Sequence, residues 1–163
     1  MSDGTEINIR QAKSGDVKAI AVILRGLGWF TYMNEETPTD TERRITRQIN
    51  LCHADKSHTV LVAEDRGSVV VGYAAVHWLP YLMLPGSEGY ISELFVSESA
   101  RGKGIGTRLL AAVTAQAMKR GCTRLMLVNR RSRDSYRRGF YSKLGWEERG
   151  EFANFVLRLP AKA

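Results

Sequence analysis

The sequence has few of the features that mark metal-binding, secreted or membrane-spanning proteins. Its two cysteines, Cys52 and Cys122, lie far apart without CxxC spacing, so neither a zinc site nor a disulfide framework is indicated. The three histidines show no metal-ligand spacing, and we expect no metal. No apolar run approaches membrane-spanning length, and the first ten residues contain no apolar signal core. We therefore expect a cytoplasmic protein with no membrane partner.

Several well-known motifs are missing as well. The phosphate-binding pattern GxxxxGK[ST] is absent, and so is the GxSxG nucleophile elbow. A dinucleotide fingerprint would lie near the first strand, whereas the only basic glycine loop comes in the middle of the chain. These absences argue against P-loop NTPases, serine hydrolases and dinucleotide-dependent oxidoreductases.

The chain that remains has the size and composition of one globular domain. It has 163 residues, of which 44% are hydrophobic and 25% charged, with no repeat or linker, so we expect a single domain over residues 1–163. Its formal net charge of +7 favours an anionic partner such as a nucleotide or nucleic acid. The alternative is that excess Lys and Arg serve only solubility.

The segment Tyr90–Leu110 carries the clearest functional signal. A strand-like run, Tyr90–Val96, is followed by a polar turn and then by the basic glycine loop Arg101–Gly106, which leads into an amphipathic helix from about Thr107. The first N–H groups of a helix have no intrahelical acceptor, and the helix dipole makes them attractive to anions. Glycine lets the backbone approach such an anion closely. The loop therefore predicts a phosphate site.

Periodicity places the other elements around this segment. Helices are expected from Ser14 to Gly28, from a capping box at Thr39–Glu42 to about Cys52, and over Asp134–Leu144. The second of these is expected to expose Arg43, Arg44 and Arg47. The inner face of the helix after the glycine loop is expected to include Leu109, Leu110, Val113, Ala117 and Met118. Strands are expected over 6–10, 59–64, 69–78, 90–96, 125–128 and 152–159. This order predicts an α/β (α+β mixed-sheet) fold.

Two motifs resemble one family. The order Arg-x-x-Gly-x-Gly, after a strand ending Glu-Leu-Phe-Val, resembles the acyl-CoA-binding motif of the GNAT superfamily of N-acetyltransferases. The run Phe140–Trp146, with Tyr141 four residues before a glycine, resembles that family's closing motif. The succession of elements also matches along nearly the whole chain. The resemblance implies a central mixed sheet flanked by four helices and acetyl-CoA as the co-substrate.

The resemblance also implies which residues bind acetyl-CoA. In the family the loop amides hold the CoA pyrophosphate, and a strand that separates from its neighbour after a β-bulge lies along the pantetheine arm, with an N–H available to polarise the thioester carbonyl. The corresponding residues here are Leu94, Phe95, Val96, Arg101, Gly102, Lys103, Gly104, Ile105, Gly106 and Thr107. Family members often have an asparagine that binds pantetheine, and this sequence departs from that pattern. Either Asn129 or Asp134 takes that place here.

Two residues match catalytic positions of the family. Tyr141 corresponds to the general acid that protonates the departing CoA thiolate, and the alternative is a tyrosine that packs the last helix against the sheet. Glu93 corresponds to an acidic residue that takes a proton from the substrate ammonium, directly or through water, or that binds it. Pairing with a basic neighbour is its structural alternative. His77 is kept as a spare base.

The acceptor is left open. Trp29, Phe30 and Tyr32 either cover the core or line the substrate mouth. The apolar loop Pro80–Gly86 either covers the substrate or forms a homodimer contact. Our prediction is transfer of an acetyl group to a primary amine of a small molecule or peptide in a ternary complex. The rival prediction is a basic module that binds acyl-CoA without turnover and engages a protein or, less favoured, nucleic acid.

Overall fold

The computed structural model describes residues 6–160, which divide into two compact units after Val128. The first unit contains the sheet and the glycine loop, and the second begins at Asn129. None of the helices in the described range is both long enough and apolar enough to cross a membrane.

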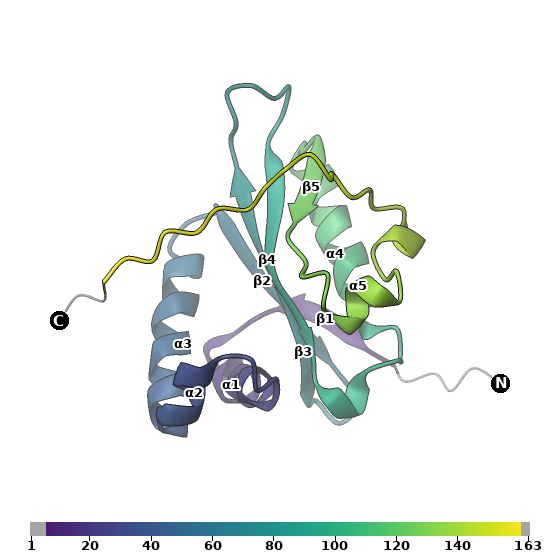
Figure 1. Cartoon of the computed structure of the whole chain (residues 1–163). Coiled ribbons are helices and arrows are strands. Elements are labelled where there is room, and N and C mark those ends of the chain that lie inside the picture. The colour runs from purple at the N-terminus through teal and green to yellow at the C-terminus, as the bar shows by residue number, and fades with distance from the viewer. Residues whose placement is uncertain (1–5, 161–163) are drawn as a thin grey trace. The chain divides into compact units, whose positions relative to one another are not determined.

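The first unit is built on one five-stranded mixed sheet (Figure 1). Its strands lie in chain order, and they are β1 (Asn8–Gln11), β2 (His58–Glu64), β3 (Val70–Leu79), β4 (Glu88–Val96) and β5 (Arg124–Leu127). The first four pair antiparallel and β5 runs parallel to β4. The predicted α/β mixed sheet is therefore confirmed.

Helices cover both faces of this sheet (Figure 1). The helices of the first unit are α1 (Val17–Gly26), α2 (Thr31–Glu35), α3 (Pro38–His53) and α4 (Ile105–Lys119). On one face, α1 and α3 enclose a core that includes Ile20, Ile45 and Val62. On the other, α4 buries Leu109 and Val113 completely. Each helix thus contributes its apolar stripe to one of two cores.

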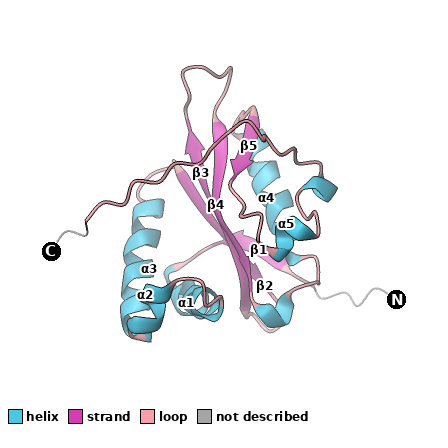
Figure 2. Cartoon of the chain, in the orientation of Figure 1, coloured by secondary structure: helices cyan, strands magenta, loops and turns pink. Residues whose placement is uncertain are grey.

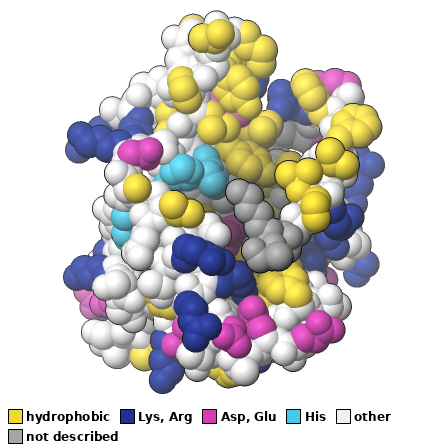
Figure 3. Space-filling view, turned by 90° about the vertical axis from the view of Figure 1, so that its left-hand side faces the viewer, with side chains coloured by type: hydrophobic (Ala, Val, Ile, Leu, Met, Phe, Trp, Pro, Cys, Tyr) yellow, Lys and Arg dark blue, Asp and Glu magenta, His cyan; other side chains and the backbone are white. Residues whose placement is uncertain are grey.

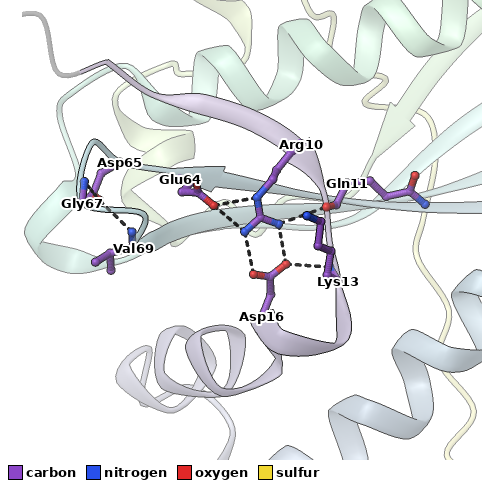
Figure 4. Close-up of polar contacts among 8 residues, drawn as sticks. All are labelled: Arg10, Gln11, Lys13, Asp16, Glu64, Asp65, Gly67 and Val69. Atoms are coloured by element: carbon purple, nitrogen blue, oxygen red, sulfur yellow. Dashed lines mark hydrogen bonds and ion pairs between the residues drawn. The ribbon is translucent and has the colours of Figure 1, made fainter.

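A cluster of charged side chains closes the far edge of the sheet (Figure 4). Arg10 on β1 donates from Nε to Glu64 on β2 at 2.7 Å and from both Nη atoms to Asp16 at 2.7 and 2.9 Å. Asp16 also accepts the N–H of Lys13 at 2.7 Å. Arg10 lowers the pKa of Asp16, while the two carboxylates raise the pKa of Arg10. All three guanidinium nitrogens are engaged, which fixes the turn before α1 to the sheet.

A β-bulge divides β4 into two parts with different neighbours. The register against β3 shifts between Ala75 and Val76, which leaves Ser92 as the extra residue. The ladder to β5 covers only Glu88–Ile91, so the rest of β4 extends beyond its parallel partner. The bulge and the short ladder to β5 lie at the position where the family resemblance implied that the two strands separate.

Three details of the sequence prediction for this unit are wrong. Helix α3 begins at Pro38, and its cap is Thr37, whose hydroxyl accepts the N–H of Asp40, because proline fits the first helical position and carries no N–H to satisfy. Arg44 leaves the exposed face, since Glu36, in the bend between α2 and α3, accepts its hydrogen bond. Met118 is 75% exposed, because the buried stripe of α4 ends on Ala117.

The second unit is smaller and less regular. Its elements are α5 (Asp134–Arg137) and a 3₁₀ turn (Ser142–Leu144). The helix predicted over Asp134–Leu144 ends early because Gly139 takes a left-handed φ of +63°. The strand predicted over 152–159 does not form: this segment has no ladder, is drawn as a loop in Figure 2, and exposes 92% of Phe155. Its alternation lacks the hydrogen-bonded partner that a strand requires.

Candidate functional site

The glycine loop has the backbone geometry of an anion-binding helix start. Gly102 and Gly104 have left-handed φ angles of +76° and +75°, and Gly104 is the cap residue of α4. A side chain added at either would meet nothing within 4 Å, so the backbone is accessible there. The helix begins at Ile105 rather than Thr107, so Ile105, Gly106 and Thr107 form its first turn and point their N–H groups at the loop.

The charged residues of the loop lie at the end of β4. Arg101 donates from Nε to the carbonyl of Val96 at 3.3 Å, which ties the loop to the strand. Both residues line a cleft of about 420 Å³ whose opposite wall is the C-terminal half of α1. Lys103 is exposed. The loop amides and the two cations thus follow directly after the part of β4 that has no ladder partner on its β5 side, an arrangement suited to anionic groups.

Glu93 lies on β4 just after the bulge and has a defined partner. Its carboxylate accepts a hydrogen bond from the hydroxyl of Tyr73 on β3. Tyr73 is buried, and this burial together with the charge of Glu93 raises the pKa of Tyr73 well above its ordinary value. The phenol therefore stays protonated and fixes the carboxylate as an acceptor. Glu93 itself is half-buried and has no basic side chain hydrogen-bonded to it within the described residues.

Two of the three aromatic residues after α1 are exposed beside this carboxylate. Trp29 is 42% exposed and packs edge-on against Phe95 with ring centroids 5.6 Å apart; Phe95 packs in the same way on Tyr73 at 5.8 Å. Tyr32 is also exposed. Phe30 packs against the core under α1. The sequence left open whether these aromatic residues cover the core or line the substrate mouth. Phe30 covers the core, whereas Trp29 and Tyr32 face solvent.

An arginine of α3 lies against one of these aromatic residues. Arg44 donates from Nη2 to Glu36 at 2.5 Å, and its guanidinium carbon lies 5.3 Å from the centre of the Tyr32 ring. The hydrogen bond to Glu36, and to a lesser extent the charge of Glu93, raise the pKa of Arg44. Its Nε is buried and has no hydrogen-bond partner in the described part of the chain. Glu93 on β4 and Arg44 on α3 thus supply an acidic and a basic group that act on each other through their charges.

The spare base His77 lies further along the same face. Its Nε2 is 2.8 Å from the hydroxyl of Ser92, and its ring packs edge-on against His58 at 4.6 Å. Burial, followed by the neighbouring His58, lowers the pKa of His77. Histidine side chains appear at the surface in Figure 3, beside hydrophobic side chains. Among residues 6–160 no group of three or more His, Cys, Asp or Glu side chains is arranged to hold a metal ion.

The remaining predicted site residues belong to the second unit. Tyr141 is half-buried between Phe140 and Trp146, and burial raises its pKa although Arg138 opposes this. Asn129 is held by Ser135, with its Nδ2 3.1 Å from that hydroxyl. Asp134 is the first residue of α5. Tyr141 is therefore a protonated phenol at neutral pH, and Asn129 and Asp134 both stay candidates for contact with pantetheine.

Sequence reasoning missed Tyr73, Glu36 and the inward position of Arg44. The usable signal was hairpin register: Tyr73 faces Phe95, and Ala75 faces Glu93, so Tyr73 and Glu93 share a sheet face one step apart. Nothing local identifies Glu36 as the partner of Arg44, because Glu36 lies in the bend between α2 and α3, eight residues before Arg44.

Comparison with known proteins gives a consistent picture. Residues 24–146 match the family model described as the acetyltransferase (GNAT) family. A thialysine N-epsilon-acetyltransferase from Bos taurus is 26% identical over 80% of this chain and 81% of its own length. An L-methionine sulfoximine/L-methionine sulfone acetyltransferase from Pseudomonas aeruginosa is 30% identical over 88% of this chain and 82% of its own.

The fold is also similar to that of a solved structure. A protein named as a transcriptional regulator from Bacillus halodurans superimposes with a TM-score of 0.79, covering 94% of this chain and 100% of the other, at 24% identity. At that identity the similarity concerns the fold.

Proposed function

The chain belongs to the acetyltransferase (GNAT) family and is an N-acetyltransferase that uses acetyl-CoA, and from this premise we propose how its residues act. We propose that residues 1–163 work as one catalytic domain, in which the first unit binds the CoA phosphates and the acceptor amine while the second supplies the general acid. The observation that carries the proposal is the hydrogen-bonded pair of Glu93 and Tyr73 beside the bulge of β4.

At the acceptor end, Glu93 takes a proton from the ammonium group. An amine attacks a thioester only as the free base, so a carboxylate held in place has a defined task. Tyr73 occupies one carboxylate oxygen, which leaves the other for the amine or for a water. The new N–C bond then forms at the thioester carbon as the C–S bond breaks. Trp29 and Tyr32, which are exposed, form the entrance for the acceptor.

At the cofactor end, the residues act through the backbone. The N–H groups in the first turn of α4 bind the pyrophosphate, and Arg101 and Lys103 add charge-assisted contacts. Leu94, Phe95 and Val96 lie along the pantetheine arm, where a strand N–H polarises the thioester carbonyl. Either Asn129 or Asp134 contacts the same arm. The open backbone at Gly102 and Gly104 supports this assignment.

Tyr141 is proposed as the general acid. The thiolate that leaves the tetrahedral carbon needs a proton, and a phenol whose pKa is raised by burial keeps its proton at neutral pH. The proton removed by Glu93 leaves through solvent, and the thiolate receives the proton of Tyr141. The nitrogen of the tetrahedral adduct is positively charged after the attack, and it loses a second proton as the C–S bond breaks. That proton, carried by water, is available to the phenolate of Tyr141. Reprotonation of the phenol completes the cycle.

The acceptor is proposed to be a small amine. The two named relatives act on thialysine and on methionine derivatives, which are amino acids.

A cytoplasmic location stays a prediction, compatible with the free thiols of Cys52 and Cys122. A homodimer also stays a prediction, compatible with the exposed side chains of Leu82 and Met83, and light scattering would test it.

Thiol release from acetyl-CoA, measured across a panel of amines, tests the proposal. We expect turnover with at least one amine and a fall of about a hundredfold in kcat for Tyr141→Phe. Phe140→Leu, which alters a neighbouring ring without removing a proton donor, is the control. Absence of turnover, together with a higher melting temperature in acetyl-CoA, would instead favour the rival module that binds acyl-CoA without turnover. A gel shift at two salt concentrations would test nucleic acid as its partner.

A further inference from the structure

A positively charged side chain, Arg44, lies near Glu93, and an acceptor that carries only an amine would have no contact for it. A site for a simple cationic amine needs negative charge and apolar walls, yet Arg44 adds a permanent positive charge close by. Arg44 lies on α3, whose Ile45 packs in the same core cluster as Tyr73. The charge of Arg44 acts on the pKa of Tyr73, whose hydroxyl donates a hydrogen bond to Glu93. A cation at this place repels a substrate that carries only positive charge and attracts one that also carries an anion.

The guanidinium of Arg44 has hydrogen-bond donors that Glu36 does not occupy. Glu36 engages only Nη2, and Glu36 is itself shared, because it also accepts the hydroxyl of Thr41 at 2.8 Å. The Nε of Arg44 is buried without an acceptor among the described residues, whereas buried donors are normally paired. About a quarter of the Arg44 side chain remains exposed. The accessible part of the guanidinium suits a carboxylate or a phosphate, whose oxygens form charge-assisted hydrogen bonds with arginine.

The surroundings of Arg44 keep it in place for such a role. The ring of Tyr32 lies over the guanidinium, and Glu36 is held near the start of α3 by Thr41 and by Arg25, which donates to the carbonyl of Glu36 at 3.1 Å. Arg44 therefore does not need to be ordered when a ligand arrives. The exposed ring of Tyr32 is in a position to pack on the apolar part of the same ligand.

We propose that the acceptor is an amine that also carries an acidic group, such as an amino acid, with the amine at Glu93 and the acid at Arg44. This inference rests on the proposed function, since it assigns a second contact within the same site. It also gives Tyr32 a role beside Trp29, as the side chain that covers the arginine and contacts the body of the acceptor.

The experiment compares acceptors that differ only in the acidic group. The probes are L-amino acids and their amides, with rates expressed per concentration of free amine so that the different amine pKa values do not bias the result. We expect the wild-type protein to prefer the acid, and Arg44→Met to lower kcat/KM for the acid by about ten- to a hundredfold, the range of one charged hydrogen bond, with little change for the amide.

Arg43→Met is the matched control. It removes the same charge one residue away, from a side chain that is 75% exposed and pairs with Asp40 on its own helix, so we expect no change in preference. Arg44→Lys should recover part of the preference, because a charge is restored without the planar group.

Three results would overturn the inference. They are a wild-type protein that acetylates amides better than acids, a loss in Arg44→Met that is equal for both, and an equal effect of Arg43→Met. If neither acids nor amides nor any other amine turned over, the proposed function itself would fail, which separates the two outcomes.

Discussion

Two arginines of the first unit, Arg10 and Arg44, both sit among carboxylates but differ in how completely they are paired. Arg10 engages two carboxylates through Nε, Nη1 and Nη2 (Figure 4). Arg44 engages one carboxylate through Nη2, and its Nε is buried without an acceptor in the described range. A saturated arginine has no hydrogen bond left to offer a ligand, whereas Arg44 has an accessible guanidinium with one nitrogen engaged by a carboxylate. We therefore assign Arg10 to the fold and Arg44 to the site.

The largest difference in activity should come from replacing one carboxylate in each region, Glu93 at the site and Glu64 beside Arg10. Glu93→Gln keeps the shape of the side chain but removes the base, so we expect kcat/KM for the acceptor to fall by about 10²–10⁴-fold at pH 7. Glu64→Gln makes the same chemical change in the Arg10 cluster and should leave kcat/KM within about twofold while lowering stability by about 1 kcal/mol. Steady-state thiol release and urea unfolding give both values. Equal losses of activity in the two variants would remove the distinction.

The glycine loop extends the comparison to backbone groups. Gly104→Val should weaken acetyl-CoA binding by about a hundredfold, because a branched residue opposes the left-handed φ of +75° and displaces amides that bind phosphate. Calorimetric titration of acetyl-CoA measures this. Gly121→Val imposes a similar strain at φ +72° just after α4 and is the control. If both variants bound acetyl-CoA equally, the loop would have no direct role.

A smaller effect is expected at the partner of Glu93. Tyr73→Phe keeps the packing against Phe95 but removes the hydrogen bond, so kcat/KM should fall by about tenfold, the equivalent of one ordinary hydrogen bond. Tyr136→Phe removes the same kind of bond, from a phenol to Glu148 at 2.8 Å in the second unit, and should leave kcat/KM unchanged. An unaltered rate in Tyr73→Phe would mean that Glu93 needs no positioning.

The Arg10 cluster should respond to pH through stability alone. Arg10 lowers the pKa of Asp16, so the ionised form contributes stability above the ordinary carboxyl pKa, and this contribution is lost as the pH falls through the lower folded value. Asp16→Asn should therefore cost about 2 kcal/mol of unfolding free energy at pH 7, and this difference should shrink below about pH 4. Urea unfolding at several pH values measures it. A cost that stayed constant down to pH 2 would contradict this origin.

How much the sequence revealed depended on how local each feature is. The glycine loop was recognisable because its amides, its left-handed residues and its cations lie within seven consecutive positions. Glu93 was found through its place on a recognisable strand. Tyr73 was missed, because its partner lies 20 residues away and is set by hairpin register. The position of Arg44 depends on α2, a short helix in a segment that reads as a loop.

The failures at the C-terminal end have a related cause. Alternating residues over 152–159 fit a half-buried strand, but a strand also needs a hydrogen-bonded neighbour, which alternation does not specify. Gly139 ends the predicted helix early, since its left-handed φ interrupts a pattern that otherwise continues to Leu144. Both errors concern how far an element extends.

The central claim is that Glu93 and Arg44 bind the two ends of one acceptor. A crystal structure of the protein with CoA and an L-amino acid that the enzyme acetylates, which together form an unreactive complex, tests it most directly. The account predicts the amine within hydrogen-bond distance of the Glu93 carboxylate and the acid group facing Arg44 and Tyr32. An acceptor whose amine lies away from Glu93, or whose acid group contacts Lys103 or Arg101 instead, would contradict it.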